Sequence, residues 1–404
     1  MTATHETARA AMPPGPYGTL SPTLAERRSS APLAPMTMPS GADILTAVNY
    51  DDVQGILACP GSSRDLTDPA LQRPIDGLTI EDVPGVLLNM DPPDHSRQRR
   101  ILRSAFTVQA AERWRQSCHA LAHELLDPAS AVIDLVAEYA LPLASRMICQ
   151  VLGIPAADYQ RFHTWSTAFL STSSESVQGR MEAYASFMEY VTRLVDSHRA
   201  NPGDDLLDEL IRAHDEGDQL TETELVNIAF MIITAGHETT AMMVSRGVFR
   251  LLLHPQQYQS LVEDPALIPS AVEEILRYDG PGSPGLVRHA TTTVELPSGA
   301  VVPPGTVVLP HLAAANHDPQ AFRCPERFDI RRYEKGTDTR GHLAFGYGPH
   351  YCLGHAFARM ELQEALRALT SRAPALRCAI PLQDAPWTTQ GITHKPVRLP
   401  VRLA

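Results

Sequence analysis

One segment of the sequence predicts an unusually long helix, and a chain that contains such a rod must build its core around it. Thr221 and Glu224 have the spacing of a capping box, in which each side chain bonds the backbone N–H of the other residue. His254-Pro255 ends the pattern, since proline interrupts a helix. We therefore expect one continuous helix over residues 222–253.

The rest of the chain reads as mostly helical. Apolar residues at three- and four-residue spacing predict helices near 96–105, 108–126, 140–152, 157–170, 178–200, 204–214, 256–262 and 268–279. Strand character is expected in 40–58, 292–295, 306–310 and 397–401, with turns at Ser298-Gly299 and Pro304-Gly305. The expected fold class is mainly α with small β-sheets (α+β). We expect one domain over residues 21–404, after a disordered leader over residues 1–20.

Composition and charge argue against several classes of protein. The formal net charge of -12 disfavours a general affinity for nucleic acid or for an anionic membrane. No uninterrupted apolar run reaches the roughly 18 residues of a membrane-spanning helix. The six cysteines are scattered and form no C-x-x-C pair, so neither a zinc site nor a disulfide framework is indicated. A cytoplasmic protein with no membrane association is expected.

The long helix is interrupted in its middle by polar residues. Ala235-Gly236-His237-Glu238-Thr239 follows an apolar run from Ile228 to Ile233. A glycine costs roughly 1 kcal/mol in a helix interior, and an acid in an apolar segment is unfavourable unless it is paired or solvated. Such local violations tend to mark functional sites. In isolation, the pattern is also consistent with a kink at Gly236 and a Glu238 that reaches solvent.

A glycine-rich loop, 345–354, carries one cysteine directly ahead of a segment rich in helix formers. Gly346, Gly348 and Gly354 can adopt backbone angles that are closed to other residues, and they let the main chain approach a flat cofactor. The start of the following helix is expected to lower the pKa of the Cys352 thiol and to favour the thiolate. We interpret Cys352 as a metal ligand, and a buried structural cysteine is the alternative.

These motifs closely resemble those of the cytochrome P-450 family. The loop has the complete pattern F-x-x-G-x-x-x-C-x-G from Phe345 to Gly354, and A-G-x-E-T at residues 235–239 resembles the oxygen-activation motif of that family. The resemblance extends from about residue 40 to the C-terminus. It implies the cytochrome P-450 fold, with the long central helix over haem b (iron protoporphyrin IX) and with Cys352 as the axial ligand of the haem iron.

The same resemblance implies roles for residues of the long helix. Ala235 and Gly236 would lie against the cofactor, with Gly236 leaving room for dioxygen. Thr239 would hydrogen-bond the reduced dioxygen, and Glu238 would relay protons from water. Both are expected to be catalytic residues.

Further residues are assigned by resemblance to holding the cofactor and its loop. Phe345, Gly346 and Gly354 would form the loop against the haem. The partners of the two haem propionates would be His95, Arg99, Arg288 and His350. A structural Glu–Arg–Arg network is expected from Glu274, Arg277 and Arg327.

The resemblance implies a monooxygenase that inserts one atom of dioxygen into a bulky, largely apolar substrate of the natural-product type. Hydroxylation is expected, and epoxidation or oxidative coupling in secondary metabolism remains open, as does a peroxide-using peroxygenase. A haem-binding sensor without turnover is the alternative from another class. Pocket walls are expected from about 60–90 and 165–185, from Ile232, Ala235 and Gly236, from 281–287 and from 391–393.

Electrons must come from separate proteins, because the sequence has no dinucleotide-binding G-x-G-x-x-G after a strand and no iron–sulfur cysteine cluster. By resemblance, NAD(P)H would reduce a ferredoxin through a ferredoxin reductase. A docking patch for an acidic ferredoxin is expected from Arg97, Arg100, Arg103, Arg113 and Arg115. A solvated helix face is the alternative for this patch. The protein is expected to be a monomer, and its few lysines hint at a high-GC bacterial source.

Overall fold

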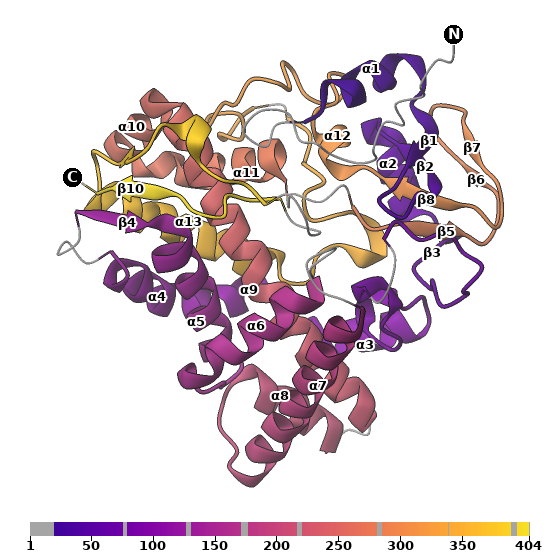
Figure 1. The fold of residues 1–404 in the computed structure, drawn as a ribbon, viewed down its shortest axis with the longest axis horizontal. Helices are drawn as coiled ribbons and strands as arrows, with labels where there is room; N and C mark the ends of the chain where they lie inside the picture. The colour runs from indigo at the N-terminus through magenta and orange to yellow at the C-terminus, as the bar shows by residue number, and fades with distance from the viewer. Residues whose placement is uncertain are drawn as a thin grey trace.

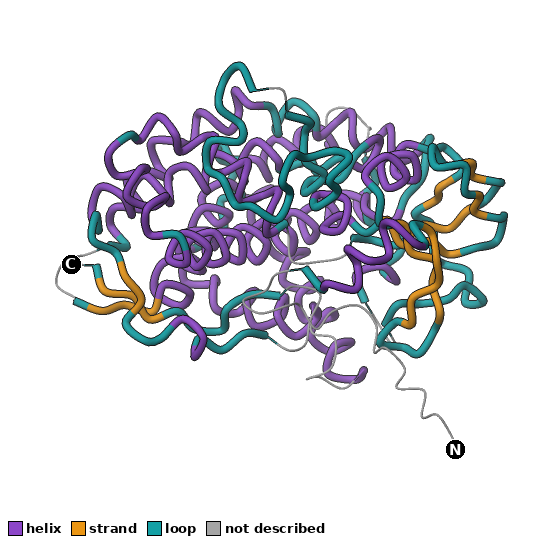
Figure 2. The backbone as a smooth tube through the Cα atoms, turned by 90° about the horizontal axis from the view of Figure 1, so that it is seen from above, coloured by secondary structure: helices purple, strands orange, loops and turns teal. Residues whose placement is uncertain are grey.

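The structure is a computed structural model that describes residues 20–75, 79–126, 131–170, 177–215, 220–280, 285–337, 339–388 and 394–403. In this part of the chain, helices form the body of the molecule, and the two larger sheets lie at opposite ends of it (Figures 1 and 2). The expected fold, mainly α with small β-sheets, is confirmed. The expected leader falls almost entirely outside the described residues, which begin at Leu20.

Thirteen α-helices are described. They are α1 (Pro22–Ser30), α2 (Tyr50–Ala58), α3 (Asp94–Leu102), α4 (Val108–Glu124), α5 (Leu141–Val151), α6 (Tyr159–Leu170), α7 (Val177–Ala200), α8 (Leu206–Asp215), α9 (Glu222–Leu253), α10 (Pro255–Glu263), α11 (Ile268–Asp279), α12 (Leu312–Asn316) and α13 (His355–Arg372). Every helix expected between residues 96 and 279 is present. The predicted bounds of α9 and α11 are confirmed, and the capping box of Thr221 and Glu224 is formed at the start of α9.

The strands form three small sheets. The largest has the order β1 (Leu33–Thr37), β2 (Asp43–Ala47), β8 (Val307–Pro310), β5 (Arg288–Ala290) and β3 (Ser62–Ser63). Within it, β2 and β8 are parallel, with Leu45 opposite Val308, and the other neighbours are antiparallel. A second sheet has the order β4 (Val132–Asp134), β10 (Pro400–Arg402) and β9 (Arg377–Cys378), and a hairpin joins β6 (Val294–Glu295) to β7 (Val301–Val302).

The predicted strand over residues 40–58 is only half right. Its first part is β2, but the chain then enters α2, with Asn49 at the helix start. Val53, Ile56 and Leu57 are buried at three- and four-residue spacing, which is the period of a helix. In an apolar run as short as this one, the alternating pattern of a strand cannot be told apart from the three- and four-residue spacing of a helix.

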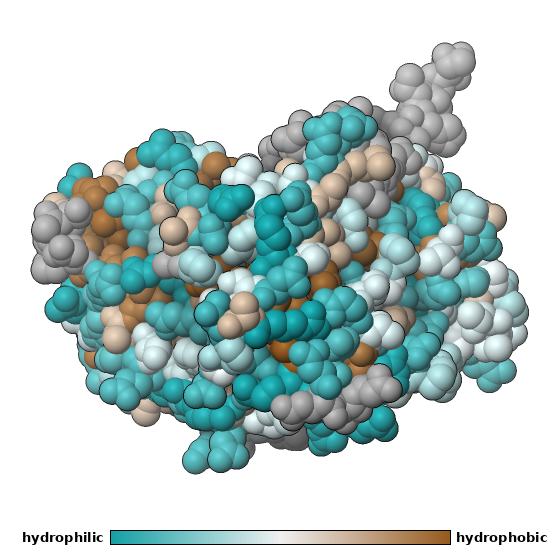
Figure 3. All heavy atoms as spheres, turned by 90° about the horizontal axis from the view of Figure 1, so that it is seen from below, coloured by the Kyte–Doolittle hydropathy of each residue, from teal (hydrophilic) through white to brown (hydrophobic). Residues whose placement is uncertain are grey.

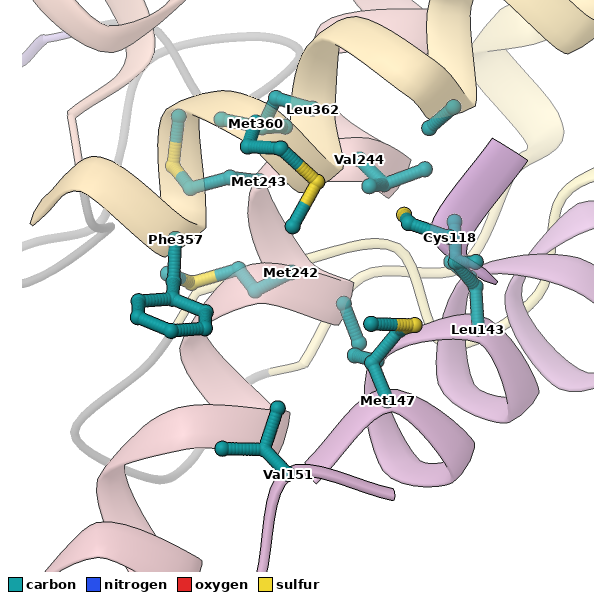
Figure 4. Packing of buried hydrophobic residues seen from close by; sticks show 14 of the residues in the cluster. Cys118, Leu143, Met147, Val151, Met242, Met243, Val244, Phe357, Met360 and Leu362 are labelled. Atoms are coloured by element: carbon teal, nitrogen blue, oxygen red, sulfur yellow. The ribbon is translucent and has the colours of Figure 1, made fainter. Parts of the chain in front are cut away.

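Helix α9 lies at the centre of the core and packs against α5, α7, α8, α11 and α13. Figure 4 shows where α4, α5, α9 and α13 meet. The labelled side chains are Cys118, Leu143, Met147, Val151, Met242, Met243, Val244, Phe357, Met360 and Leu362. Flexible methionine side chains fill the irregular gaps between these helices. Among the described residues, α9 is also the one helix long and apolar enough to cross a membrane, but 72% of its most apolar stretch is buried inside the fold.

The expected Glu–Arg–Arg network exists, but one member differs from the prediction. Glu274 and Arg277 form a fully buried ion pair, with 2.7 Å between Oε2 and Nε. The third member is Arg332, whose Nε lies 3.0 Å from the same Glu274 oxygen. The predicted member, Arg327, is exposed and pairs with Asp329. The reason is that the Asp329 N–H donates to Glu274, at 2.9 Å, which brings the residues that follow onto α11.

Arg332→Ala should destabilise the protein, because it removes one partner of a fully buried carboxylate. Breaking such a pair costs roughly 3–5 kcal/mol. Arg327→Ala is the matched control and should leave the urea midpoint unchanged, since that side chain is exposed. Urea unfolding of the two variants beside the wild type measures the difference. A loss confined to Arg327→Ala would show that Arg327 is the third member after all.

Candidate functional site

The loop that carries Cys352 begins at Phe345 and leads into α13. Gly346 and Gly348 both have a φ of 72°, in the left-handed region that side chains disfavour. A Cβ on Gly348 would also lie 2.7 Å from the carbonyl oxygen of Leu57 in α2. The Cys352 N–H donates to the Phe345 carbonyl, at 2.8 Å. The glycines therefore set the shape of the loop, as expected, and hold the cysteine in place ahead of the helix.

Gly354 and the Cys352 thiol differ from the expectation. Gly354 has an ordinary φ of -81°, and a Cβ on it would meet no atom of the described residues within 4 Å. Burial raises the pKa of Cys352, and the Gly354 N–H and the charges of Arg99 and Arg359 offset this only in part. The predicted lowering of the pKa is therefore wrong for the free thiol, because desolvation outweighs the field of the helix. A metal ion bound to the sulfur deprotonates a thiol outright.

Two arginines brace the loop, and the sequence analysis did not assign a role to one of them. The Arg359 guanidinium on α13 lies 4.5 Å from the centre of the Phe345 ring. It also binds the Glu273 carboxylate of α11 through hydrogen bonds of 2.7 and 2.9 Å. From α3, Arg99 donates to the carbonyl of Tyr351, at 2.5 Å. Three helices thus fix the position of the loop.

The four side chains predicted to bind the propionates lie together beside this loop. His95 and Arg99 come from α3, Arg288 comes from β5, and His350 belongs to the short helix Gly348–His350 within the loop. The rings of His95 and His350 are 4.2 Å apart. Arg99 and Arg288 interact electrostatically with both histidines. We call His95, Arg99, Arg288 and His350 the cationic cradle, after the charge of its two arginines.

Among the described residues, Glu81 and Asp91 act on Arg288 through their charge, but no carboxylate forms an ion pair with it. Arg288 is 4% exposed, and the described residues offer its guanidinium only the backbone carbonyls of Leu286 and Val287, at 3.2 and 3.3 Å. Burial, and then the nearby Arg64, lower the pKa of Arg288 to about 9. Burial and Arg288 lower the pKa of His350 to about 2.

These side chains have the chemistry of an anion-binding site. The buried Nε2 of His95 has no hydrogen-bond partner among the described residues. Buried cationic groups require an anionic or hydrogen-bonding partner. The two propionate carboxylates of haem provide this chemistry, and the thiol of Cys352 lies in the adjoining loop. The residues therefore fit haem.

The polar segment of α9 presents two different faces. Ala235 and Thr239 are exposed and one turn apart, although most of the surrounding helix is buried. The hydroxyl of Thr239 donates to the Ala235 carbonyl, at 2.7 Å. His237 and Glu238 are buried, with 0% and 5% exposure. The described side chains thus leave the face with Thr239 uncovered, as a ligand-binding face would be.

Gly236 does not face that open side. A Cβ on Gly236 would lie 2.9 Å from Cδ1 of Ile148 in α5. The missing side chain therefore lets α9 and α5 pack closely. The packing on Ile148 is a second reason for glycine at this position, and the role of Gly236 in leaving room for dioxygen stays a prediction. Ala235, with its small side chain, lies on the uncovered face instead.

Glu238 has partners that the sequence analysis missed. Its carboxylate forms an ion pair with the ammonium of Lys395, and both side chains are largely buried. Burial alone would raise the pKa of Glu238, but Lys395 outweighs burial and lowers it. One donor atom from each of His163, His237 and Glu238 lies within 4.8 Å of the other two. His163 and Lys395 are remote in sequence, and the one available signal was that Lys395 is one of only two lysines.

The predicted pocket walls are only partly described. Residues 76–78, 281–284 and 391–393, and part of the segment 165–185, lie outside the described residues. Ile232 on α9 is half-buried, and Ala235 is exposed. Val287 is not part of a wall, because it packs in the core with Ile44 and Val307 of the largest sheet.

Comparison with known proteins agrees with this geometry. A family model described as Cytochrome P450 matches residues 141–372. Mycinamicin IV hydroxylase/epoxidase from Micromonospora griseorubida is 37% identical over 387 residues, which cover 95% of each chain. Nocardicin C N-oxygenase from Nocardia uniformis subsp. tsuyamanensis is 38% identical over 387 residues, again 95% of each chain.

A solved structure shows the same fold. The LnmA cytochrome P450 hydroxylase from the leinamycin biosynthetic pathway of Streptomyces atroolivaceus has a TM-score of 0.85 and 39% identity. That match covers 95% of this chain and 96% of the LnmA chain. The cysteine loop, the cationic cradle and the polar segment of α9 therefore occur in a fold that binds haem. The chain belongs to the cytochrome P450 family of haem-thiolate monooxygenases.

Proposed function

We propose that this monooxygenase acts on a bulky, largely apolar substrate of the natural-product type, with hydroxylation as its main reaction. The observation that carries the proposal is the acid–alcohol pair Glu238–Thr239 in the middle of α9, with Thr239 on the uncovered face. Relatives named for the oxidation of mycinamicin and nocardicin support this class of substrate. Epoxidation is the second candidate, because the mycinamicin relative is named a hydroxylase/epoxidase.

We further propose how the residues of the site divide the work. Cys352 would ligate the iron, the cationic cradle would bind the propionates, and Phe345, Gly346 and Gly354 would lie against the haem. When bound, haem supplies the redox chemistry that activates dioxygen. The Thr239 hydroxyl, which donates to the Ala235 carbonyl in this structure, would turn that hydrogen bond toward a ligand on the uncovered face of α9. Glu238 would act as a general acid that passes protons toward Thr239, and its carboxylate would then be protonated again from water.

The electron donor that we propose is a ferredoxin, reduced by NAD(P)H through a ferredoxin reductase. Of the five arginines expected in the docking patch, Arg100, Arg103 and Arg113 are exposed. The other two are engaged within the protein. Arg97 binds Glu224, and Arg115 binds Glu112 and Glu364. The docking patch proposed here is therefore Arg100, Arg103 and Arg113 on α3, its C-terminal end and α4.

We also propose that the protein is a single domain, is cytoplasmic and is a monomer. A continuous hydrophobic cluster joins residues from Ile80 to Leu403, which supports one domain over residues 21–404. All six cysteines are free thiols, as expected in the cytoplasm. Polar side chains predominate on the face in Figure 3, which supports a monomer.

Thr239→Ala should bind haem and substrate normally but form less product per NAD(P)H, because reduced dioxygen loses its hydrogen-bond donor and is released as hydrogen peroxide. The measurement is the ratio of product to NAD(P)H consumed. Ser245→Ala is the matched control. Ser245 makes the same kind of bond on the same helix, 2.8 Å to the Ala241 carbonyl, but is buried in the core. An unchanged ratio in Thr239→Ala would show that another hydroxyl donates this hydrogen bond.

Charge reversal in the docking patch should weaken the interaction with ferredoxin. Arg103→Glu and Arg100→Glu should raise the apparent Km for ferredoxin and leave substrate affinity unchanged. The rate of reduction by ferredoxin should fall as salt is added, since exposed charges are screened over roughly 8 Å at physiological ionic strength. Stopped-flow reduction across a salt series measures both effects.

Arg377→Glu is the control for this series. It makes the same change in net charge at an exposed residue of β9, in the sheet at the far end of the molecule from α3 (Figure 1). A rate of reduction that does not change with salt, or that falls equally in Arg377→Glu and Arg103→Glu, would show that ferredoxin docks elsewhere.

A further inference from the structure

A buried lysine lies against the acid of the acid–alcohol pair. The side chains of Lys395 and Glu238 are 13% and 6% exposed, and their charged groups are in direct contact. A buried ion pair is weak evidence for a stabilising role, because apolar side chains of similar size often stabilise a protein as well or better. The chain has only two lysines, and Lys335, the other one, is exposed. The buried position of Lys395 therefore suggests a role other than stability.

The backbone that carries Lys395 is firmly held. Its N–H donates to the Thr388 hydroxyl at 3.0 Å, and the Thr388 N–H donates to the Lys395 carbonyl at 2.9 Å. The preceding residue, His394, accepts a hydrogen bond of 2.5 Å from Arg246 of α9 and stacks on Trp387, with ring centres 4.9 Å apart. Arg246 lies about two turns beyond Glu238 on the same helix. Lys395 is thus fixed relative to α9 independently of the ion pair.

Two histidines also lie close to Glu238. The Nδ1 of His237 is 2.8 Å from the Ile233 carbonyl, so this nitrogen carries the proton and the tautomer is fixed. Its Nε2 lies 3.2 Å from the Ser166 hydroxyl. His163 of α6 has a half-buried ring, and its buried Nδ1 has no partner among the described residues. One oxygen of Glu238, Oε2, is likewise buried without a partner there.

We propose that Lys395 is a positioning residue that holds the Glu238 carboxylate beside His163, and that His163 is the group that returns a proton to Glu238 in each cycle. The proposal rests on the role proposed above for Glu238 and Thr239. The donor atoms of His163 and Glu238 lie within 4.8 Å of each other, and no hydrogen bond joins them directly, so the imidazolium of His163 would give its proton to the carboxylate through a bridging water. Glu238 then passes a proton toward Thr239 and becomes a carboxylate again, and neutral His163 takes a proton from the solvent. His237 keeps its proton on Nδ1, in the hydrogen bond to the Ile233 carbonyl, and takes no part in the proton transfer.

The charges around Glu238 support these different roles for His163 and His237. The ionisable groups that face Glu238 are Lys395 from the C-terminal segment, His237 from α9, and His163 and Tyr159 from α6. Burial lowers the pKa of His237 to about 4, so this ring is neutral near pH 7. Burial also lowers the pKa of His163, whereas Glu238 acts to raise it. Because the donor must be protonated, proton delivery through His163 should slow as the pH rises through its pKa.

The ion pair can be observed without turnover, because only two lysines contribute signals. Lysine labelled with nitrogen-15 at Nζ would be observed by NMR in the haem-loaded protein, as its diamagnetic reduced carbon monoxide complex. Lys395→Met identifies the signal of Lys395. We expect its ammonium protons to exchange slowly in the wild type, and to exchange as fast as those of Lys335 in Glu238→Gln. Fast exchange at Lys395 in the wild type would overturn the proposal.

The turnover rates of four variants test whether Lys395 and His163 act in proton delivery through Glu238. Lys395→Met should lower the rate of product formation about tenfold, since positioned proton transfer contributes at least that much, with haem content and substrate Km unchanged. Lys395→Arg should restore most of the rate. His163→Gln should cause a similar loss and remove the decline with rising pH. The double variant should be no slower than either single variant, because both act through Glu238. Lys335→Met is the matched control and should match the wild type.

The outcomes separate this proposal from the function on which it rests. If Glu238→Gln turns over like the wild type, the proposed role of Glu238 itself is wrong. If Glu238→Gln is slow but Lys395→Met and His163→Gln are normal, Glu238 is protonated by another route and the present proposal fails. Additive losses in the double variant would also overturn it, since Lys395 and His163 would then act independently.

Discussion

The burial of α9 along most of its length is the constraint on which the rest of the site depends. Apolar surface removed from water contributes roughly 25 cal/mol per Å², and α9 is covered by α5, α7, α8, α11 and α13. The helix cannot shift without exposing that surface, so the polar residues in its middle stay fixed. The contacts that attach this polar segment to other parts of the chain include the close packing of Gly236 on Ile148, the contact of His237 with Ser166 and the ion pair of Glu238 with Lys395.

Buried charge is treated differently in the two parts of the site. At Glu238 the protein supplies its own counter-ion, Lys395, and the pair is complete within the fold. Around Arg288, the described residues supply cationic groups without a carboxylate in direct contact. An uncompensated buried charge is costly, so the cationic cradle favours a ligand that brings carboxylates. This contrast explains how one fold can keep an internal proton donor and still bind an anionic cofactor.

Features that depend on local sequence were predicted well. The capping box at Thr221 and the stop at His254-Pro255 set the bounds of α9, and Gly346 and Gly348 of the Cys352 loop adopt the left-handed angles expected of them. Features that depend on distant contacts were not. Arg327 and Arg332 cannot be told apart until the chain folds back onto α11.

The same limit applies to charge and packing within the site. Lys395 meets Glu238 only because the C-terminal segment crosses α9, and no local pattern predicts that contact. The direction that Gly236 faces could not be predicted without knowing that Ile148 of α5 lies against it. For Cys352, the helix field can be foreseen from sequence, whereas the larger effect of burial on the pKa requires the folded structure.

Ligation of the haem iron by Cys352 is tested most directly by the absorption spectrum of the reduced carbon monoxide complex. A thiolate ligand shifts the Soret band of that complex strongly to the red. The wild type should show this band, and so should Cys324→Ser, a control at an exposed cysteine. Cys352→Ser should lose the red-shifted band while the fold remains intact by circular dichroism. A red-shifted band that survives in Cys352→Ser would contradict the site described here.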